Sequence, residues 1–138
     1  MPLDKTKYKI LKLDCPAEKV LRITFDRPET YNSLDADGHR ELAYIWREID
    51  DDPTINSVLI TGAGKAFSSG GDFEMIEKVM DDFDFRAQIW KEAKDLVYNV
   101  INCSKPIVSA INGPAVGAGL VAGLLADISI VGKKAKIV

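Results

Sequence analysis

One stretch of the sequence decides the fold, and it reads KPIVSAINGPAVGAGL from Lys105 to Leu120. Residues 107–111 form an apolar run that is typical of a buried strand. Asn112-Gly113-Pro114 then turns the chain, and a compact helix of small residues is expected from Ala118 to Leu125. A strand that leads through a glycine-rich turn into a helix start presents backbone N–H groups without intrahelical partners.

A second stretch has the same layout and reads KAFSSGGDF from Lys65 to Phe73. It follows a short apolar strand predicted from Ser57 to Thr61, and a short helix is expected over Phe73 to Ile76. Two such helix starts that converge on one oxygen would form an oxyanion hole. The pair of turns therefore predicts an enzyme that stabilises negative charge on a carbonyl.

The remaining predicted elements continue the alternation of strands and helices, which favours an α/β fold. The linker between the first two strands is too short for a crossover helix, so these strands are predicted to form an antiparallel hairpin. Residues 81–84 are predicted as an acidic surface loop. The expected strands are Tyr8 to Leu13, Lys19 to Phe25, Asp127 to Val131 and the start of another at 133–138. The long helices are expected from Asp35 to Ile49 and from Phe85 to Ile101, the latter with Trp90, Ala93, Val97 and Val100 on one face.

Composition limits the class of protein. The 138 residues suffice for one domain with a core, and 46% hydrophobic with 28% charged residues is typical of a soluble globular protein. The net charge of −3 provides no basic field for nucleic acid. The start of the chain has no apolar signal-peptide region, and the apolar segment 107–131 is broken by Asn112-Gly113-Pro114, so we expect a cytoplasmic protein without membrane contact.

Four motifs in order resemble those of the crotonase superfamily, also called the enoyl-CoA hydratase/isomerase family. They are Arg27-Pro28-x-x-x-Asn32-Ser33-Leu34, Ala66-Phe67-Ser68-Ser69-Gly70-Gly71-Asp72, Lys105 to Gly113, and Gly117-Ala118-Gly119 followed by Asp127-Ile128. The resemblance implies a crotonase-like spiral of ββα units. Family members are about twice as long, so residues 1–138 correspond to the N-terminal part of a single core domain whose C-terminal part is absent, and we expect a fragment.

The resemblance also implies a substrate and a site. The substrate would be an acyl-CoA thioester, as in fatty acid metabolism, with its oxygen held by the backbone N–H groups of Gly71 and Ala118. Coenzyme A, as part of the substrate, would contact Ser68, Ser69, Gly70, Gly71, Asp72, Phe73 and Ala118. No separate cofactor and no metal are implied, and the family assembles as homotrimers or as hexamers.

Val121 departs from the family pattern. Hydratases of the family carry the first of two catalytic glutamates at this position, and valine cannot transfer a proton. We therefore expect isomerisation, decarboxylation or hydrolysis rather than two-glutamate hydration. Dehalogenases of the family carry a histidine near Ala93, which this chain lacks. Two alternatives stay open: a non-catalytic acyl-CoA binder, and a half-domain that assembles with another chain.

Several single residues have simpler expected roles. Asp72 is expected to cap a helix, Asp127 to form structural hydrogen bonds, and His39 to lie on the surface. Arg27 and Lys65 are expected to be solvated charges, with contact to the phosphates of CoA as the alternative. Cys15 and Cys103 lack metal-ligand spacing and are expected to be free, buried thiols.

Overall fold

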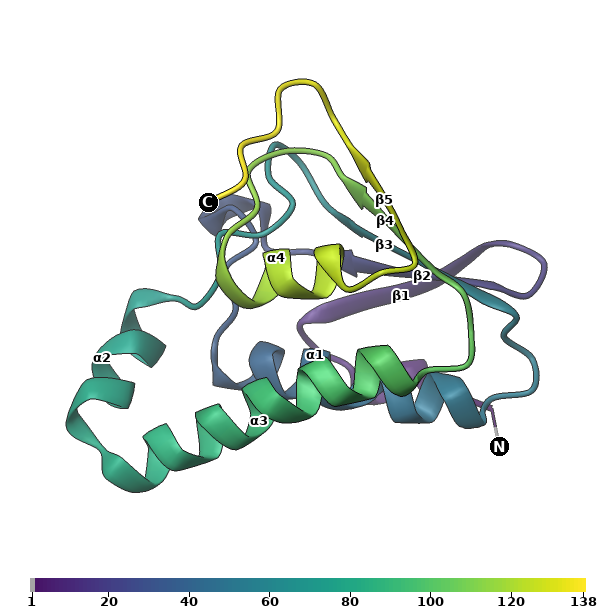
Figure 1. The fold of residues 1–138 in the computed structure, drawn as a ribbon. Coiled ribbons are helices and arrows are strands. Elements are labelled where there is room, and N and C mark those ends of the chain that lie inside the picture. The colour runs from purple at the N-terminus through teal and green to yellow at the C-terminus, as the bar shows by residue number, and fades with distance from the viewer. Residues whose placement is uncertain (1) are drawn as a thin grey trace.

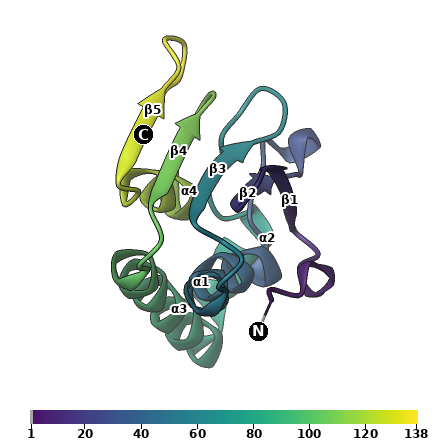
Figure 2. The ribbon, with the colours of Figure 1, turned by 90° about the vertical axis from the view of Figure 1, so that its right-hand side faces the viewer.

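The computed structural model describes residues 2–138 and shows a five-stranded sheet with the strand order β1-β2-β3-β4-β5. Helices α1, α3 and α4 cover one face of this sheet, whereas α2 lies to one side of it (Figures 1 and 2). The elements are β1 Leu11–Ala17, β2 Val20–Phe25, α1 Ala36–Asp51, β3 Ser57–Gly62, α2 Phe73–Asp81, α3 Phe83–Asn102, β4 Ile107–Ile111, α4 Gly117–Leu124 and β5 Ile128–Val131, with short 3-10 turns at Lys5–Lys7 and Pro28–Thr30.

The predicted antiparallel hairpin is confirmed, since β1 pairs antiparallel with β2, and the strands from β2 to β5 are all parallel neighbours. The first strand begins at Leu11 rather than at Tyr8 and runs on to Ala17. The Glu41 carboxylate on α1 explains the late start, because it accepts the backbone N–H groups of residues 9–11 and holds this segment against α1.

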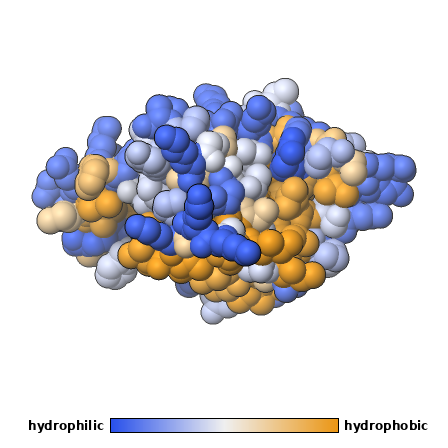
Figure 3. Space-filling view, turned by 90° about the horizontal axis from the view of Figure 1, so that it is seen from above, coloured by the Kyte–Doolittle hydropathy of each residue, from blue (hydrophilic) through white to orange (hydrophobic). Residues whose placement is uncertain are grey.

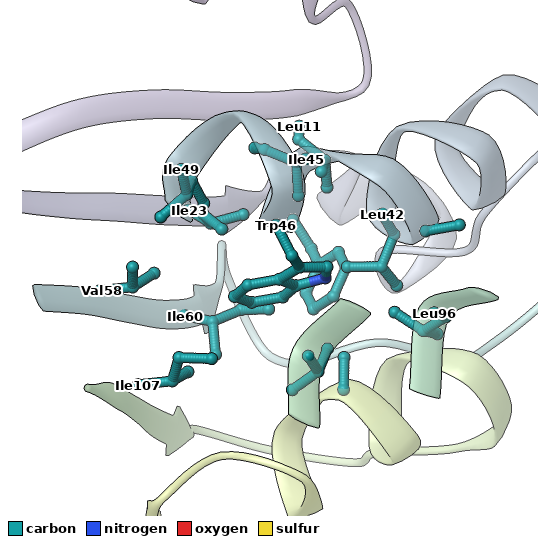
Figure 4. Packing of buried hydrophobic residues seen from close by; sticks show 14 of the residues in the cluster. Leu11, Ile23, Leu42, Ile45, Trp46, Ile49, Val58, Ile60, Leu96 and Ile107 are labelled. Atoms are coloured by element: carbon teal, nitrogen blue, oxygen red, sulfur yellow. The ribbon is translucent and has the colours of Figure 1, made fainter. Parts of the chain in front are cut away.

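The core forms where the alternating strand residues meet the apolar stripe of α1. Trp46 is fully buried at its centre and packs between the sheet and the other helices (Figure 4). Within residues 2–138 its indole N–H has no acceptor, so Trp46 contributes through packing rather than hydrogen bonding. The residues around it include Ile23, Leu42, Ile45, Ile49, Val58, Ile60, Leu96 and Ile107.

The predicted acidic loop at 81–84 is wrong, because only Asp82 separates α2 from α3. Asp82 ends α2 by donating its N–H to Lys78 O, and its carboxylate caps α3 by accepting the N–H of Phe85 at 3.0 Å. One extended residue that caps both helices turns the chain without a loop. Helix α2 consequently runs to Asp81 instead of ending at Ile76.

Two residues of the apolar face that the sequence indicates for α3, Trp90 and Ala93, are exposed, Trp90 to 69%. The buried face includes two polar residues, Glu92 and Asn99, together with Leu96 and Val100. Both polar side chains bond to α1, and Asn99 donates to Ala43 O at 2.7 Å. Hydrogen bonding between two helices therefore rotates α3 away from the orientation that its apolar pattern predicts.

His39 is 4% exposed rather than on the surface. Its Nδ1 lies 2.9 Å from Glu92 Oε2, while Arg40 and Gln88 donate to Glu92 Oε1 at 3.3 Å and 3.0 Å. Burial alone would raise the pKa of Glu92, but these hydrogen bonds outweigh it and hold that pKa below its ordinary value. The charged form of Glu92 is therefore the form that joins α1 to α3.

The lowered pKa gives Glu92 a pH-dependent effect on stability. A carboxyl group whose pKa is depressed in the folded state stabilises the protein above its ordinary pKa of 4.5 and loses this effect as pH falls through the lowered value. We expect Glu92→Gln to lower the free energy of unfolding at pH 7 by about 1–2 kcal/mol. Urea unfolding should show the difference from wild type shrinking below pH 4.5; a difference constant with pH would contradict this.

The uncovered face of the sheet includes Ile128 and Ile130 of β5, which are exposed. An apolar surface continues along β5 and α4 (Figure 3). The strand predicted to start at 133–138 does not form, and this segment instead makes a single bridge between Ile137 and Ala115. Across residues 2–138, none of the helices is long and apolar enough to span a bilayer.

Candidate functional site

The two glycine-rich stretches lie side by side at one edge of the sheet. Strands β3 and β4 are parallel neighbours, so the segments that follow them leave the sheet at the same end. The N–H groups of Phe67 and Ser68 donate to Pro114 O at 3.0 and 3.2 Å, and Val116 N–H donates to Ser68 O at 2.8 Å. The convergence of the two turns that the sequence predicts is thus present.

Backbone meets backbone where these turns cross. Gly70 and Gly117 have φ values of +83° and +58°, a region that favours glycine. A Cβ on Gly117 would lie 3.4 Å from the Cα of Gly70, and a Cβ on Gly70 would lie 3.1 Å from Val116 O. The backbone conformation therefore favours glycine at both positions, and at Gly70 the close approach of Val116 O adds to this requirement.

The backbone N–H groups of residues 68–72 all have acceptors except one. Within residues 2–138 the N–H of Gly71 has no partner. Gly71 forms a parallel bridge with Leu34, in which the hydrogen bonds come from its two neighbours, Gly70 O and Asp72 N–H. Gly71 thus presents a donor that the fold itself does not use. The other four N–H groups donate from Ser68 to Pro114 O, from Ser69 to Tyr31 O, from Gly70 to Ser68 Oγ and from Asp72 to Leu34 O.

The start of α4 supplies a second set of such donors. No side chain caps this helix at Val116, and the first N–H bonded to it is that of Leu120, at 3.4 Å from Val116 O. Within the part of the chain that the structure describes, the N–H groups of Gly117, Ala118 and Gly119 have no acceptor. Donors at a helix N-terminus, beside the Gly71 turn, form an arrangement able to bind a negatively charged oxygen.

Two asparagines hold the turn that leads into this site. Asn32, which is 1% exposed, donates to Ala63 O and Ala66 O at 2.8 Å each and accepts the N–H of Arg27 at 2.9 Å. Asn112, which is exposed, bonds to residues of the same turn at 3.1–3.2 Å. The shape of the turn at residues 62–66 is therefore stabilised by side chains from two other loops.

Arg27 corrects one expectation. Its Nη1 donates to Ser33 O at 3.2 Å and lies 3.5 Å from Asp35 Oδ2 and 3.8 Å from Asp72 Oδ2. The Arg27 side chain is thus partly buried and compensated within the fold, rather than a free solvated charge. Lys65, by contrast, is exposed as expected.

The expected roles of both aspartates are confirmed. Asp72 caps α2 by accepting the N–H of Met75 at 2.9 Å, and Asp127 accepts the N–H of Ile107 at 2.7 Å. The cysteines are both free, but Cys15 is exposed rather than buried, and Cys103 is half-buried. Burial raises the pKa of the Cys103 thiol, which disfavours a reactive thiolate.

Sequence reasoning missed Met75, and it named Ser68 as a ligand contact without predicting the contacts that Ser68 makes within the fold. Met75 of α2 reaches Gly71, where a Cβ would lie 2.5 Å from the Met75 Cε. The Ser68 side chain is buried beside Gly119 of α4. The α2 helix pattern carries a signal for Met75, which lies one helical turn after the Asp72 cap, but no local signal marks the contact of Ser68.

An open depression between α1, α2 and α3 does not coincide with these donors. It is lined by the carboxylates of Asp35, Asp37, Asp72 and Glu74 together with Lys78. This excess of negative charge would repel phosphate groups. Within residues 2–138, no cluster of three His, Cys, Asp or Glu side chains could hold a metal ion.

The chain belongs to the enoyl-CoA hydratase/isomerase family, whose model matches residues 16–138. It is 33% identical over 121 residues to a 1,2-epoxyphenylacetyl-CoA isomerase of Escherichia coli and 36% identical over 118 residues to an (E)-benzylidenesuccinyl-CoA hydratase of Thauera aromatica. A crystal structure of an enoyl-CoA hydratase/isomerase from Mycobacterium paratuberculosis superimposes with a TM-score of 0.89 at 37% identity.

These matches cover most of this chain but only part of each relative. The match to the isomerase covers 86% of this chain and 46% of the isomerase. The match to the hydratase covers 85% of this chain and 45% of the hydratase. The crystal structure matches 93% of this chain and 51% of its own. The expected α/β fold of the crotonase type is thereby confirmed, and the chain spans about half the length of the relatives it matches.

The two asparagines lead to a stability prediction. Asn32→Ala leaves one buried N–H and two carbonyl groups without this partner, so we expect a loss of about 2–3 kcal/mol in the free energy of unfolding. Asn112→Ala is the matched control, and its loss should be about 1 kcal/mol because water reaches that site. Urea unfolding of both variants measures the difference, and equal losses would contradict the assigned roles.

Proposed function

We propose that this chain binds an acyl-CoA thioester and holds its carbonyl oxygen between the backbone N–H groups of Gly71 and Ala118. The observation that carries this proposal is the unpartnered Gly71 N–H beside the uncapped start of α4. Hydrogen bonds from both sides would stabilise the enolate that forms when a proton leaves the carbon next to the carbonyl. The names of the two relatives, both CoA thioester enzymes, support this substrate class.

Coenzyme A would run along residues 68–73, where glycines allow close approach of the ligand to the backbone. Phe73 is 86% exposed at the start of α2 and offers an apolar surface to the ligand. The exposed Lys65 would contact a phosphate through a charge-assisted hydrogen bond. The proposal includes assembly as a homotrimer or hexamer, for which the exposed Ile101 and Leu124 offer apolar contact area.

Val121 determines which chemistry we propose. It lies on α4 after Ala118 and is 38% exposed. By the family resemblance, this is the position at which hydratases carry the first catalytic glutamate, and valine cannot transfer a proton. We therefore favour isomerisation, or another reaction that needs a single acid or base, over two-glutamate hydration. The same observation favours a second candidate, a non-catalytic acyl-CoA binder. A half-domain that joins another chain remains the third alternative.

Removal of the Ala118 N–H tests the proposed oxyanion hole. Ala118→Pro deletes this donor in the first turn of α4, where proline is tolerated because the N–H makes no intrahelical bond. We expect turnover of a CoA thioester to fall about 100-fold or more, as after loss of other oxyanion-hole donors. If the chain is a non-catalytic binder, the affinity for the thioester should fall instead, and calorimetry measures it.

Ala118→Gly serves as the control because it keeps the N–H and changes only the side chain. We expect it to retain most of the activity and affinity. Equal performance of the proline and glycine variants would refute a role for this N–H group. Absence of any CoA thioester binding to the wild-type protein would refute the proposed function as a whole.

Val121→Glu tests the role of the apolar side chain. The exposure of Val121 leaves room for a carboxylate at the expected position of the first family glutamate. If only the proton-transfer group is missing, we expect hydration of an enoyl-CoA to appear or to rise at least tenfold. The assay measures the decrease in absorbance of the enoyl group. Val121→Gln, which cannot exchange a proton at neutral pH, is the control and should show no such gain.

A further inference from the structure

The hydroxyl group of Ser68 joins three parts of the site. Ser68 is fully buried, and its Oγ donates to Asn32 O at 2.9 Å and accepts the N–H of Gly70 at 3.2 Å. The first bond reaches the loop between β2 and α1, and the second reaches the residue directly before Gly71. One side chain therefore fixes the neighbouring loop and the peptide group adjacent to the donor.

The same side chain also sets the position of α4. A Cβ on Gly119 would lie 2.3 Å from the Ser68 Cβ and 2.4 Å from its Oγ. The serine side chain therefore packs directly against the backbone of Gly119, and a side chain at residue 119 would clash with it. Gly119 follows Ala118 in the first turn of the helix. Ser68 thus touches the structure on both sides of the proposed oxyanion hole.

We propose that Ser68 is a positioning residue that aligns the Gly71 and Ala118 N–H groups on one oxygen; this inference rests on the proposed function. Its hydroxyl accepts the Gly70 N–H. Without this bond, the Gly70 N–H would be a free donor next to Gly71 and could compete with it for the ligand oxygen. Gly70 has a φ of +83° and no side chain to restrain its peptide group. The bond to Ser68 Oγ supplies the missing restraint and leaves Gly71 as the donor that faces the ligand.

The test compares two ligands that differ only in the carbonyl oxygen. Butyryl-CoA has the thioester carbonyl, whereas the thioether S-butyl-CoA lacks it. The ratio of their dissociation constants, measured by calorimetry, reports the hydrogen bonds to the carbonyl and cancels the contribution of the CoA body. We expect wild type to prefer the thioester about tenfold, the equivalent of one to two net hydrogen bonds.

Ser68→Ala keeps the Cβ beneath α4 and removes the hydroxyl. We expect the preference for the thioester to fall at least threefold while the affinity for the thioether is unchanged. Difference infrared spectra of 1-¹³C-butyryl-CoA give a second readout. The carbonyl stretch of the bound ligand should lie closer to its solution value in Ser68→Ala than in wild type, because misaligned donors polarise the carbonyl less.

Ser109→Ala is the matched control. Ser109 is equally buried, and its hydroxyl donates to Gly123 O of α4 at 2.7 Å without contact to either proposed donor. It should lose stability yet keep the wild-type preference for the thioester. If Ser68→Ala does not fold, Ser68→Cys fills the same space with a weak sulfur acceptor and should show the same loss of preference.

The outcomes separate this inference from the proposed function. A wild-type preference that persists in Ser68→Ala, or in Ser68→Cys where the alanine variant does not fold, would overturn the inference and leave the proposed function intact. Equal loss of affinity for both ligands would assign Ser68 a purely structural role and would also overturn the inference. A wild-type protein that binds neither ligand, or binds both equally, would overturn the proposed function together with the inference.

Discussion

The close approach of two main-chain turns, at Gly70 and Gly117, is the constraint on which the rest of the site depends. A Cβ on Gly70 would lie 3.1 Å from Val116 O, and hydrogen bonds from residues 67 and 68 to Pro114 O join the same two segments. Parallel pairing of β3 with β4 brings the turns together, and the core around Trp46 holds these strands against the helices. The sheet therefore acts as a rigid support for two short irregular segments.

The loop between β2 and α1 contributes strain as well as support. Tyr31 and Asn32 have φ values of +54° and +59°, a region that costs a residue with a side chain about 1 kcal/mol. Asn32 offsets this cost with three hydrogen bonds, and asparagine tolerates the conformation better than most residues. The strained backbone in turn directs the carbonyls of Tyr31 and Asn32 toward Ser69 and Ser68.

Features governed by local sequence could be predicted, and features that depend on distant partners could not. Strand β4 matches its predicted bounds because its apolar run lies between Pro106 and the Asn-Gly-Pro turn. Free N–H groups at the two helix starts likewise follow from the strand-turn-helix order, whereas their assignment to Gly71 and Ala118 came from the resemblance to the family. Burial of Glu92 on α3 could not be predicted because its partner, His39, lies on α1, and the apolar pattern of one helix does not reveal a partner on another. The hydrogen bond from Ser68 to a carbonyl in another loop could not be predicted for the same reason.

Backbone N–H groups have one property that side-chain donors lack: every amino-acid substitution except proline preserves them. Mutation can exchange Ala118 for most other residues without deleting the N–H, and only proline removes it. Val121 is 38% exposed on the same helix, and its contribution lies in its side chain alone. Under the proposed function, most substitutions at residue 118 would therefore keep the donor, whereas a polar substitution at residue 121 would change the chemical character of the surface beside it.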